Sequence, residues 1–174
     1  MATNGTSQMT HRVEGTELVL ERTFNAPRAL VFEAFSKAEH LKHWWGPQGW
    51  TLPVCNVDFR PGGSWLYCMK CEDERQEGFY GMESWGKAVY LEIDEPERIV
   101  YEDFFADPEG NPVEGMPSAH STLLFVEENG KTRLINRTRY ASAEDLQKVL
   151  GMGMLEGIGQ TWDRLDELLA QLQK

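Results

Sequence analysis

The feature that most constrains this fold is a long amphipathic segment near the C-terminal end, from Gly151 to Leu172. At 3.6 residues per turn, apolar side chains gather on one broad face and charged or amide side chains on the other. The apolar face comprises Gly151, Met154, Leu155, Ile158, Trp162, Leu165, Leu168, Leu169 and Leu172. A helix of this length with so wide an apolar face must bury that face against a large surface.

Glycines set the two halves of this segment apart. Four of them, at positions 151, 153, 157 and 159, lie in its first half, and each costs about 1 kcal/mol relative to alanine inside a helix. We therefore expect a loosely packed first half beside an open space and a leucine-rich second half that anchors the helix. The preceding apolar stripe, Leu146 to Leu150, points in another direction, which predicts a break at Gly151–Gly153.

Upstream of the helix, apolar and polar residues alternate with the period of β-strands. Seven strands are expected, at Glu17–Asn25, Val54–Arg60, Ser64–Cys71, Ser84–Asp94, Arg98–Phe105, Ala119–Glu127 and Thr132–Tyr140. Turn signals such as Pro61-Gly62-Gly63 favour hairpins between neighbours. Two short helices, beginning near Pro27 and Ser36, are expected after the first strand.

This order of elements predicts an α+β fold in which a seven-stranded antiparallel, curved sheet wraps round the C-terminal helix. A sheet that is apolar on one face must cover that face, and only the final helix is long enough to do so. Such a sheet is hard to fill with side chains alone, so we expect a cavity at the glycine-rich end of the helix. We predict a single domain over residues 16–174, preceded by a flexible tail over residues 1–15.

Composition excludes several classes of function. The 174 residues include 28 acidic and 17 basic ones, for a formal net charge of −11. Such a chain repels nucleic-acid phosphates and anionic membranes, so neither nucleic acid nor membrane insertion is expected. No apolar run approaches the ~18 residues needed to span a bilayer, and the N-terminus lacks an apolar signal core. With three cysteines, an odd and sparse set, reduced thiols in the cytoplasm are expected.

Five stretches in this order resemble the START-like (SRPBCC, birch-pollen-allergen-like) superfamily with its helix-grip fold, and within it the branch of heat-shock-protein-90 ATPase activator homologues. They are Leu20 to Phe35 (LERTFNAPRALVFEAF), Leu41 to Gly46 (LKHWWG), Val57 to Met69 (VDFRPGGSWLYCM), Ile93 to Val100 (IDEPERIV) and Gly157 to Leu168 (GIGQTWDRLDEL). The resemblance implies two short helices and a seven-stranded sheet around a hydrophobic, lipid-binding type of cavity, and a stress-response setting. One departure is Ile158, where relatives often carry Trp, which alters the shape of the cavity.

Aromatic residues supply the candidate ligand site, with six Trp, five Tyr and eight Phe in the chain. Small-molecule sites are mostly apolar pockets with a few polar groups, and buried Trp and Tyr need hydrogen-bond partners. Part of the set belongs to the core, and part is expected to line the cavity. The expected ligand-binding residues are Phe59, Trp65, Tyr67, Trp85, Tyr101, Met154, Ile158 and Trp162, with His120 as a polar contact.

Other chemistry-bearing residues have simpler interpretations. The imidazole of His120 is a side chain of the type used for acid–base work, with Glu102, Asp103 and Asn136 as companions, but the residue also fits an ordinary strand histidine. His40 and His43 lack a third ligand for zinc, and the cysteines at 68 and 71 point to opposite faces of a strand. No metal or cofactor is expected. Three arginines, at 133, 137 and 139, form either a solvated outer face or an anchor for an acidic partner.

Three functions follow from these observations. The first is binding of a small hydrophobic or aromatic molecule between sheet and helix. The second is an enzyme, because superfamily relatives include cyclases and hydrolases that act on aromatic compounds; no catalytic residue is assigned. The third is an interaction module or a homodimer. Within this third function a chaperone is the less expected partner, because eukaryotic activators contact the chaperone through a separate N-terminal domain that we do not expect here.

Overall fold

The computed structural model describes residues 8–174, which form an antiparallel sheet and four helices. The strands are β1 (Thr10–Glu14), β2 (Glu17–Phe24), β3 (Trp50–Val57), β4 (Ser64–Cys71), β5 (Glu83–Asp94), β6 (Arg98–Phe105), β7 (Ser118–Glu128) and β8 (Lys131–Tyr140). The helices are α1 (Arg28–Ser36), α2 (Ala38–Trp44), α3 (Ala143–Leu150) and α4 (Met154–Leu172). The strand order is β1-β2-β8-β7-β6-β5-β4-β3, so the α+β class and the antiparallel sheet are confirmed.

The predicted count of seven strands is wrong, because the sheet has eight. The additional strand, β1, lies within the segment predicted as a flexible tail, and it pairs from Thr10↔Glu21 to Glu14↔Glu17. All five of its side chains are exposed, so no apolar alternation marks it in the sequence. Main-chain hydrogen bonds hold it, and Arg12 adds ion pairs with Glu14 and, at 3.0 Å, with Glu21. Residues 1–7 of the predicted tail lie outside the described residues.

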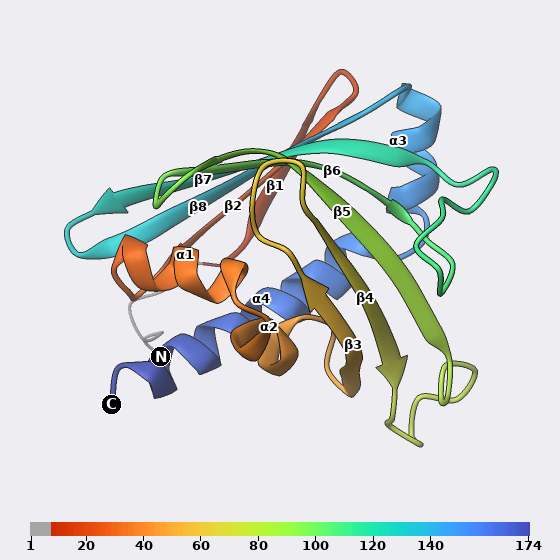
Figure 1. The fold of residues 1–174 in the computed structure, drawn as a ribbon, viewed down its shortest axis with the longest axis horizontal. Coiled ribbons are helices and arrows are strands. Elements are labelled where there is room, and N and C mark those ends of the chain that lie inside the picture. The colour runs from red at the N-terminus through yellow and green to blue at the C-terminus, as the bar shows by residue number, and fades with distance from the viewer. Residues whose placement is uncertain (1–7) are drawn as a thin grey trace.

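The C-terminal helix α4 runs along one face of the sheet, which bends over it, while α1 and α2 lie beside the helix on the same side (Figure 1). We call this side of the sheet the inner face; it carries Leu18, Phe24, Phe125 and Leu134, all buried. Trp162 of α4 meets Phe24 edge to face, with ring centroids 6.0 Å apart. The predicted location of the apolar core, between sheet and helix, is therefore confirmed.

The two halves of α4 pack differently, as the glycine pattern predicts. In the second half Trp162, Leu165, Leu168 and Leu169 are buried, whereas the apolar residues of the first half are only partly covered. The break is also confirmed: α3 ends at Leu150, and Gly153 precedes α4 with φ of 81°. A departure from the predicted apolar face is Leu172, which is 38% exposed at the last turn.

An arginine on the inner face connects β2 to α4. Arg22 alternates with Leu18, Leu20 and Phe24 on this face and is only 7% exposed. Its Nη1 lies 2.7 Å from Oδ1 of Asp163, and its guanidinium lies 5.2 Å from the centre of the Phe24 ring. A buried guanidinium is tolerated here because a carboxylate and an aromatic face replace the water that it loses.

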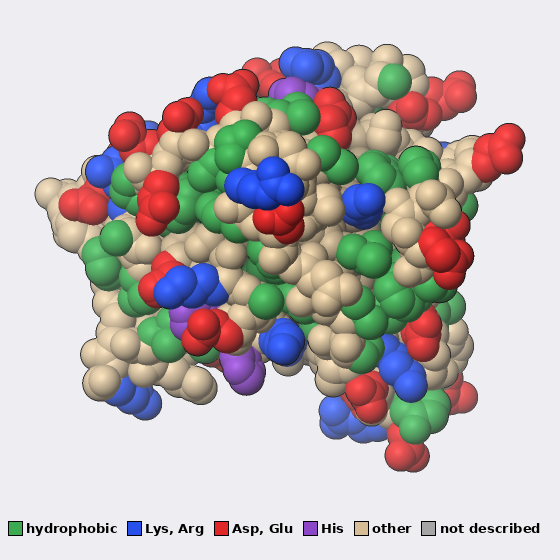
Figure 2. All heavy atoms as spheres, in the orientation of Figure 1, with side chains coloured by type: hydrophobic (Ala, Val, Ile, Leu, Met, Phe, Trp, Pro, Cys, Tyr) green, Lys and Arg blue, Asp and Glu red, His purple; other side chains and the backbone are tan. Residues whose placement is uncertain are grey.

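The outer surface is polar, and acidic and basic side chains are interspersed on the face shown in Figure 2. None of the described helices combines the length and the apolar character that a membrane crossing requires.

The anchoring role of the second half of α4 leads to a stability prediction. We expect Leu165→Ala to lower the free energy of unfolding by about 2–5 kcal/mol, because it leaves a cavity in a fully buried position. The matched change Leu172→Ala, at the exposed end of the same helix, should alter it by about 0.5 kcal/mol or less. Urea unfolding followed by circular dichroism measures both, and equal losses would contradict the assignment of the anchor.

Candidate functional site

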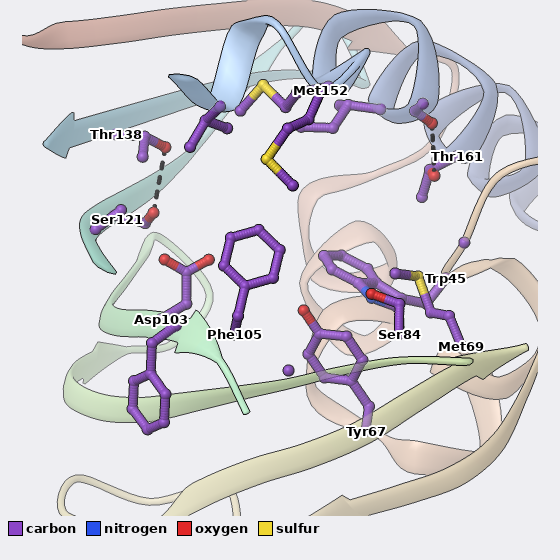
Figure 3. A pocket seen from close by; sticks show the side chains of 18 of the residues that line it. Trp45, Tyr67, Met69, Ser84, Asp103, Phe105, Ser121, Thr138, Met152 and Thr161 are labelled. Atoms are coloured by element: carbon purple, nitrogen blue, oxygen red, sulfur yellow. Dashed lines mark hydrogen bonds between the residues drawn. The ribbon is translucent and has the colours of Figure 1, made fainter. Parts of the chain in front are cut away.

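A cavity of about 370 Å³ lies between the inner face of the sheet and the first half of α4. Strands β4 to β8 form one wall, α3 and α4 form the opposite wall, and the loop after α2 closes one side (Figure 3). Its position beside the glycine-containing half of the helix is the one that the sequence predicts. The lining is mainly apolar, with aromatic rings and methionine side chains and a small group of polar atoms.

Two aromatic rings form one side of the cavity, and a third supports them from behind. Trp45, the residue that directly follows α2, lies edge-on to Tyr67 of β4 with ring centroids 5.7 Å apart. Trp65 packs behind both, 4.7 Å from Trp45 and 4.6 Å from Tyr67. Aromatic pairs in this geometry are stabilising beyond the area they bury, so Trp45 and Tyr67 form a rigid wall.

Tyr67 keeps its position because the residue opposite it has no side chain. Tyr67 pairs across the strands with Gly86 of β5. A Cβ at this glycine would lie 2.5 Å from Cζ of the Tyr67 ring, closer than carbon atoms can approach. Gly86 therefore leaves the space in which the phenol ring lies against the sheet.

Arg164 fixes the loop that closes the cavity. Its guanidinium donates hydrogen bonds to the carbonyl oxygens of Gly46 (2.8 Å), Trp50 (3.1 Å) and His43 (3.2 Å), and more weakly to that of Pro47 (3.3 Å). Because Gly46 and Pro47 both line the cavity, α4 holds this part of the rim directly.

The polar end of the cavity is built around Asp103 of β6. Ser121 and Thr138 lie near it in Figure 3, and their hydroxyls are hydrogen-bonded to each other at 3.2 Å. Thr138 also donates to Oδ1 of Asn136 at 2.6 Å. Burial, together with the negative charge of Glu102, raises the pKa of Asp103 to about 7. The carboxyl therefore changes its charge near neutral pH.

Phenol groups surround this carboxyl. Burial raises the pKa values of Tyr67, Tyr101 and Tyr140 above the usual range, and the negative charge of Asp103 adds to the effect. These hydroxyls stay protonated at neutral pH and act as neutral donors or acceptors.

Five of the nine predicted ligand-binding residues lie in the cavity wall as expected: Tyr67, Tyr101, Met154, Ile158 and Trp162. Their contact with a ligand stays a prediction. A sixth, Trp85, also belongs to the lining. Its indole N–H donates to Glu83 at 3.2 Å, and both residues alternate with Ser84 and Gly86, which face the cavity. A register shift between Tyr90 and Glu92 exchanges the two faces of β5, so alternation counted back from Ile93 does not extend to Trp85.

Three predicted residues lie elsewhere. His120 points to the outer face, where its Nδ1 lies 3.0 Å from Oε1 of Glu102, while its neighbours Ala119 and Ser121 face the cavity. Both faces of β7 carry apolar residues, so alternation did not settle its direction. Phe59 follows the end of β3 and packs on Tyr90, 5.0 Å between centroids. Trp65 lies behind the wall rather than in it.

Sequence reasoning missed Asp103 as a cavity residue and missed Trp45. The signal for Asp103 was available, because alternation along β6 puts Tyr101, Asp103 and Phe105 on one face. The signal for Trp45 was weaker, since it lies just past the end of α2, where helical periodicity no longer applies.

The remaining candidate motifs have structural partners. Arg133 pairs with Glu21 at 3.1 Å, and Arg137 pairs with Glu17 at 2.8 Å, as expected for an outer face. The three cysteines are free thiols. Over residues 8–174, no group of three or more His, Cys, Asp or Glu side chains is placed to hold a metal ion.

An antiparallel sheet bent over a C-terminal helix, with a cavity between them, defines the START-like (SRPBCC) class of proteins. Within that class, the chain belongs to the family of activator of Hsp90 ATPase homolog 1-like proteins, whose family model matches residues 25–170. The resemblance seen in the sequence is thereby confirmed.

Solved structures agree with this assignment. Protein Ms6760 from Mycobacterium smegmatis is 30% identical, with a TM-score of 0.81 over 94% of this chain and 96% of that one. A protein from Staphylococcus epidermidis is 32% identical, with a TM-score of 0.79 over 94% of both chains. One from Arthrobacter aurescens is 26% identical, with a TM-score of 0.80 over 94% of this chain and 91% of that one. No curated protein matches the sequence.

The contact between Gly86 and Tyr67 leads to a prediction about the wall. We expect Gly86→Ala to lower the free energy of unfolding by about 1–3 kcal/mol, because the new methyl group forces the phenol ring out of its place. In a Tyr67→Ala background the same change should have almost no effect, since the obstructing ring is gone. Urea unfolding of the four proteins in this cycle measures the coupling, and equal losses in both backgrounds would show that the ring is not the obstacle.

Proposed function

We propose that this protein binds a small hydrophobic or aromatic molecule in a helix-grip cavity, between the inner face of the sheet and the first half of α4. The observation that carries the proposal is the cavity itself, about 370 Å³ in volume and lined mainly by apolar and aromatic side chains. Ligand sites are typically of this size and composition. An empty apolar cavity lowers the stability of a fold, so a ligand that fills this one would stabilise the protein.

The binding test uses an uncharged fluorescent probe, N-phenyl-1-naphthylamine, which is small enough for the cavity. We expect saturable binding with one site per chain. Ile158→Trp should weaken it about tenfold or more, because an indole on the cavity side of α4 occupies the space of the probe. The matched variant Leu172→Trp places the same side chain at the exposed end of the helix and should leave binding unchanged.

Circular dichroism of both variants establishes that they are folded. Absence of saturable binding to the unmodified protein would refute the proposal, and so would equal binding to the two variants. Mass spectrometry of the natively purified protein then identifies any small molecule that it carries.

A second candidate function, an enzyme acting on an aromatic substrate, is favoured by one observation. The carboxyl of Asp103, whose pKa is raised to about 7, lies in the same cavity as the hydroxyls of Tyr67 and Tyr101. A carboxyl that titrates near neutral pH suits general acid–base catalysis. Incubation of a metabolite extract with the protein and with Asp103→Asn, followed by untargeted mass spectrometry, tests this. A compound consumed only by the unmodified protein supports catalysis, and identical profiles contradict it.

A further inference from the structure

The part of the chain that the structure describes lines the cavity with one acidic side chain and no basic one. Asp103 lines it, whereas no Lys, Arg or His belongs to the lining that residues 8–174 provide. The hydroxyls of Ser121 and Thr138, which lie near it in Figure 3, bond to each other, and that of Thr138 donates to Asn136. Asp103 therefore presents a carboxylate to the cavity with no cation from the described chain beside it.

The strands on either side leave room next to this carboxylate. Asp103 pairs with Ala88 of β5 and with Ala119 of β7, both of which have minimal side chains. Asp103 is only partly exposed, and a carboxylate that is partly removed from water is stabilised by a partner of opposite charge. The arrangement suits a ligand that brings the partner with it.

The aromatic walls also favour a ligand with a positive charge. Tyr101 and Phe105 flank Asp103 on the same face of β6, and Trp45 and Tyr67 form the adjoining wall. The faces of aromatic rings attract cations, and rings combined with a carboxylate are a general arrangement for binding ammonium groups. A fatty acid or another anionic ligand would instead meet a like charge at this end.

From this geometry we infer that the ligand is a hydrophobic amine, whose protonated nitrogen pairs with the carboxylate of Asp103 while its apolar body lies along the aromatic wall. The inference rests on the proposed binding function and names the chemical class of the ligand. The acidic character of the chain, with a formal net charge of −11, also favours the approach of cations over anions.

Among the cavity groups that residues 8–174 provide, Asp103 alone changes charge between pH 5.5 and 8. The titratable groups that face it are the phenols of Tyr67 on β4, Tyr101 on β6 and Tyr140 on β8, which stay neutral because burial raises their pKa values. Cavity residues from α3 and α4, such as Val149 and Met154, carry no charge. Glu102 lies on the outer face, beside His120. An amine that is protonated throughout this range should therefore bind more tightly as the carboxyl loses its proton.

The test compares three probes with the same ring system, 1-naphthylmethylamine, 1-naphthalenemethanol and 1-naphthoate, by isothermal titration calorimetry at pH 8. We expect the amine to bind about tenfold or more tightly than the alcohol, because an ammonium–carboxylate ion pair replaces the hydrogen bond of an uncharged hydroxyl, and the naphthoate to bind most weakly. Asp103→Asn should abolish the preference for the amine and leave the affinity for the alcohol within about threefold. The control Glu102→Gln removes the same charge one residue away, on the outer face, and should retain the preference.

A second measurement needs no variant. From pH 8 to pH 5.5 the affinity of the unmodified protein for the amine should fall about tenfold or more, since the carboxyl becomes protonated below its pKa near 7, whereas affinity for the alcohol should stay constant. Equal affinity for amine and alcohol, a preference that survives in Asp103→Asn, or an amine affinity independent of pH would each overturn the inference. Binding of the alcohol in those cases would leave the proposed function standing. Failure of all three probes and of N-phenyl-1-naphthylamine would overturn both.

Discussion

The structure depends on the burial of the second half of α4 against the inner face of the sheet. Leu165 and Leu169 are almost fully buried, and Trp162 packs edge-on against Phe24 of β2. The hydrophobic effect makes this contact the main favourable term holding sheet and helix together. Arg22 and Asp163 add a directed contact between the same two elements. With one end of the helix fixed in this way, the other end is held at a distance from strands β4 to β8.

The cavity exists because the residues that could fill it are small or are held back. Gly86 allows Tyr67 to lie against β5, and Ala88 and Ala119 leave space on either side of Asp103. Gly157 contributes in the same way from α4, where a Cβ would meet only Pro47, at 3.8 Å. An unfilled space and a partly desolvated carboxylate both reduce stability. Features that lower stability in one place are typical of sites that have another role.

The fold could be read largely from periodicity, because most strands bury one face and α4 buries one broad stripe. The boundaries of β4 and β6 match the predicted ones. The start of β3 was missed because a register shift between Thr51 and Val54 interrupts its alternation. The strand β1 was missed because it buries no side chain at all.

The candidate site was harder to read, because alternation shows that two faces differ without showing which one faces inward. On β7 both faces carry apolar residues, so His120 was assigned to the cavity although Ser121 lies there. On β5 a register shift exchanges the faces partway along the strand, so alternation counted from Ile93 does not extend to Trp85, which nevertheless belongs to the cavity lining. Tyr67, Tyr101 and Trp162 were placed in the wall correctly, because each lies on a regular stretch of its own element. The polar end of the cavity could not be predicted from the sequence, because it depends on contacts between strands that are distant in sequence.

The short strand β1 forms the edge of the sheet beside β2, and its side chains therefore determine the character of that edge. The strand it covers, β2, contains the consecutive buried residues Leu18, Val19 and Leu20. Without β1 those residues would form an open, apolar edge, the kind of template on which chains add to one another and aggregate. With β1 in place, the outermost strand carries only exposed side chains, among them the ion-paired Arg12 and Glu14. Those few polar residues protect the colloidal stability of the whole domain.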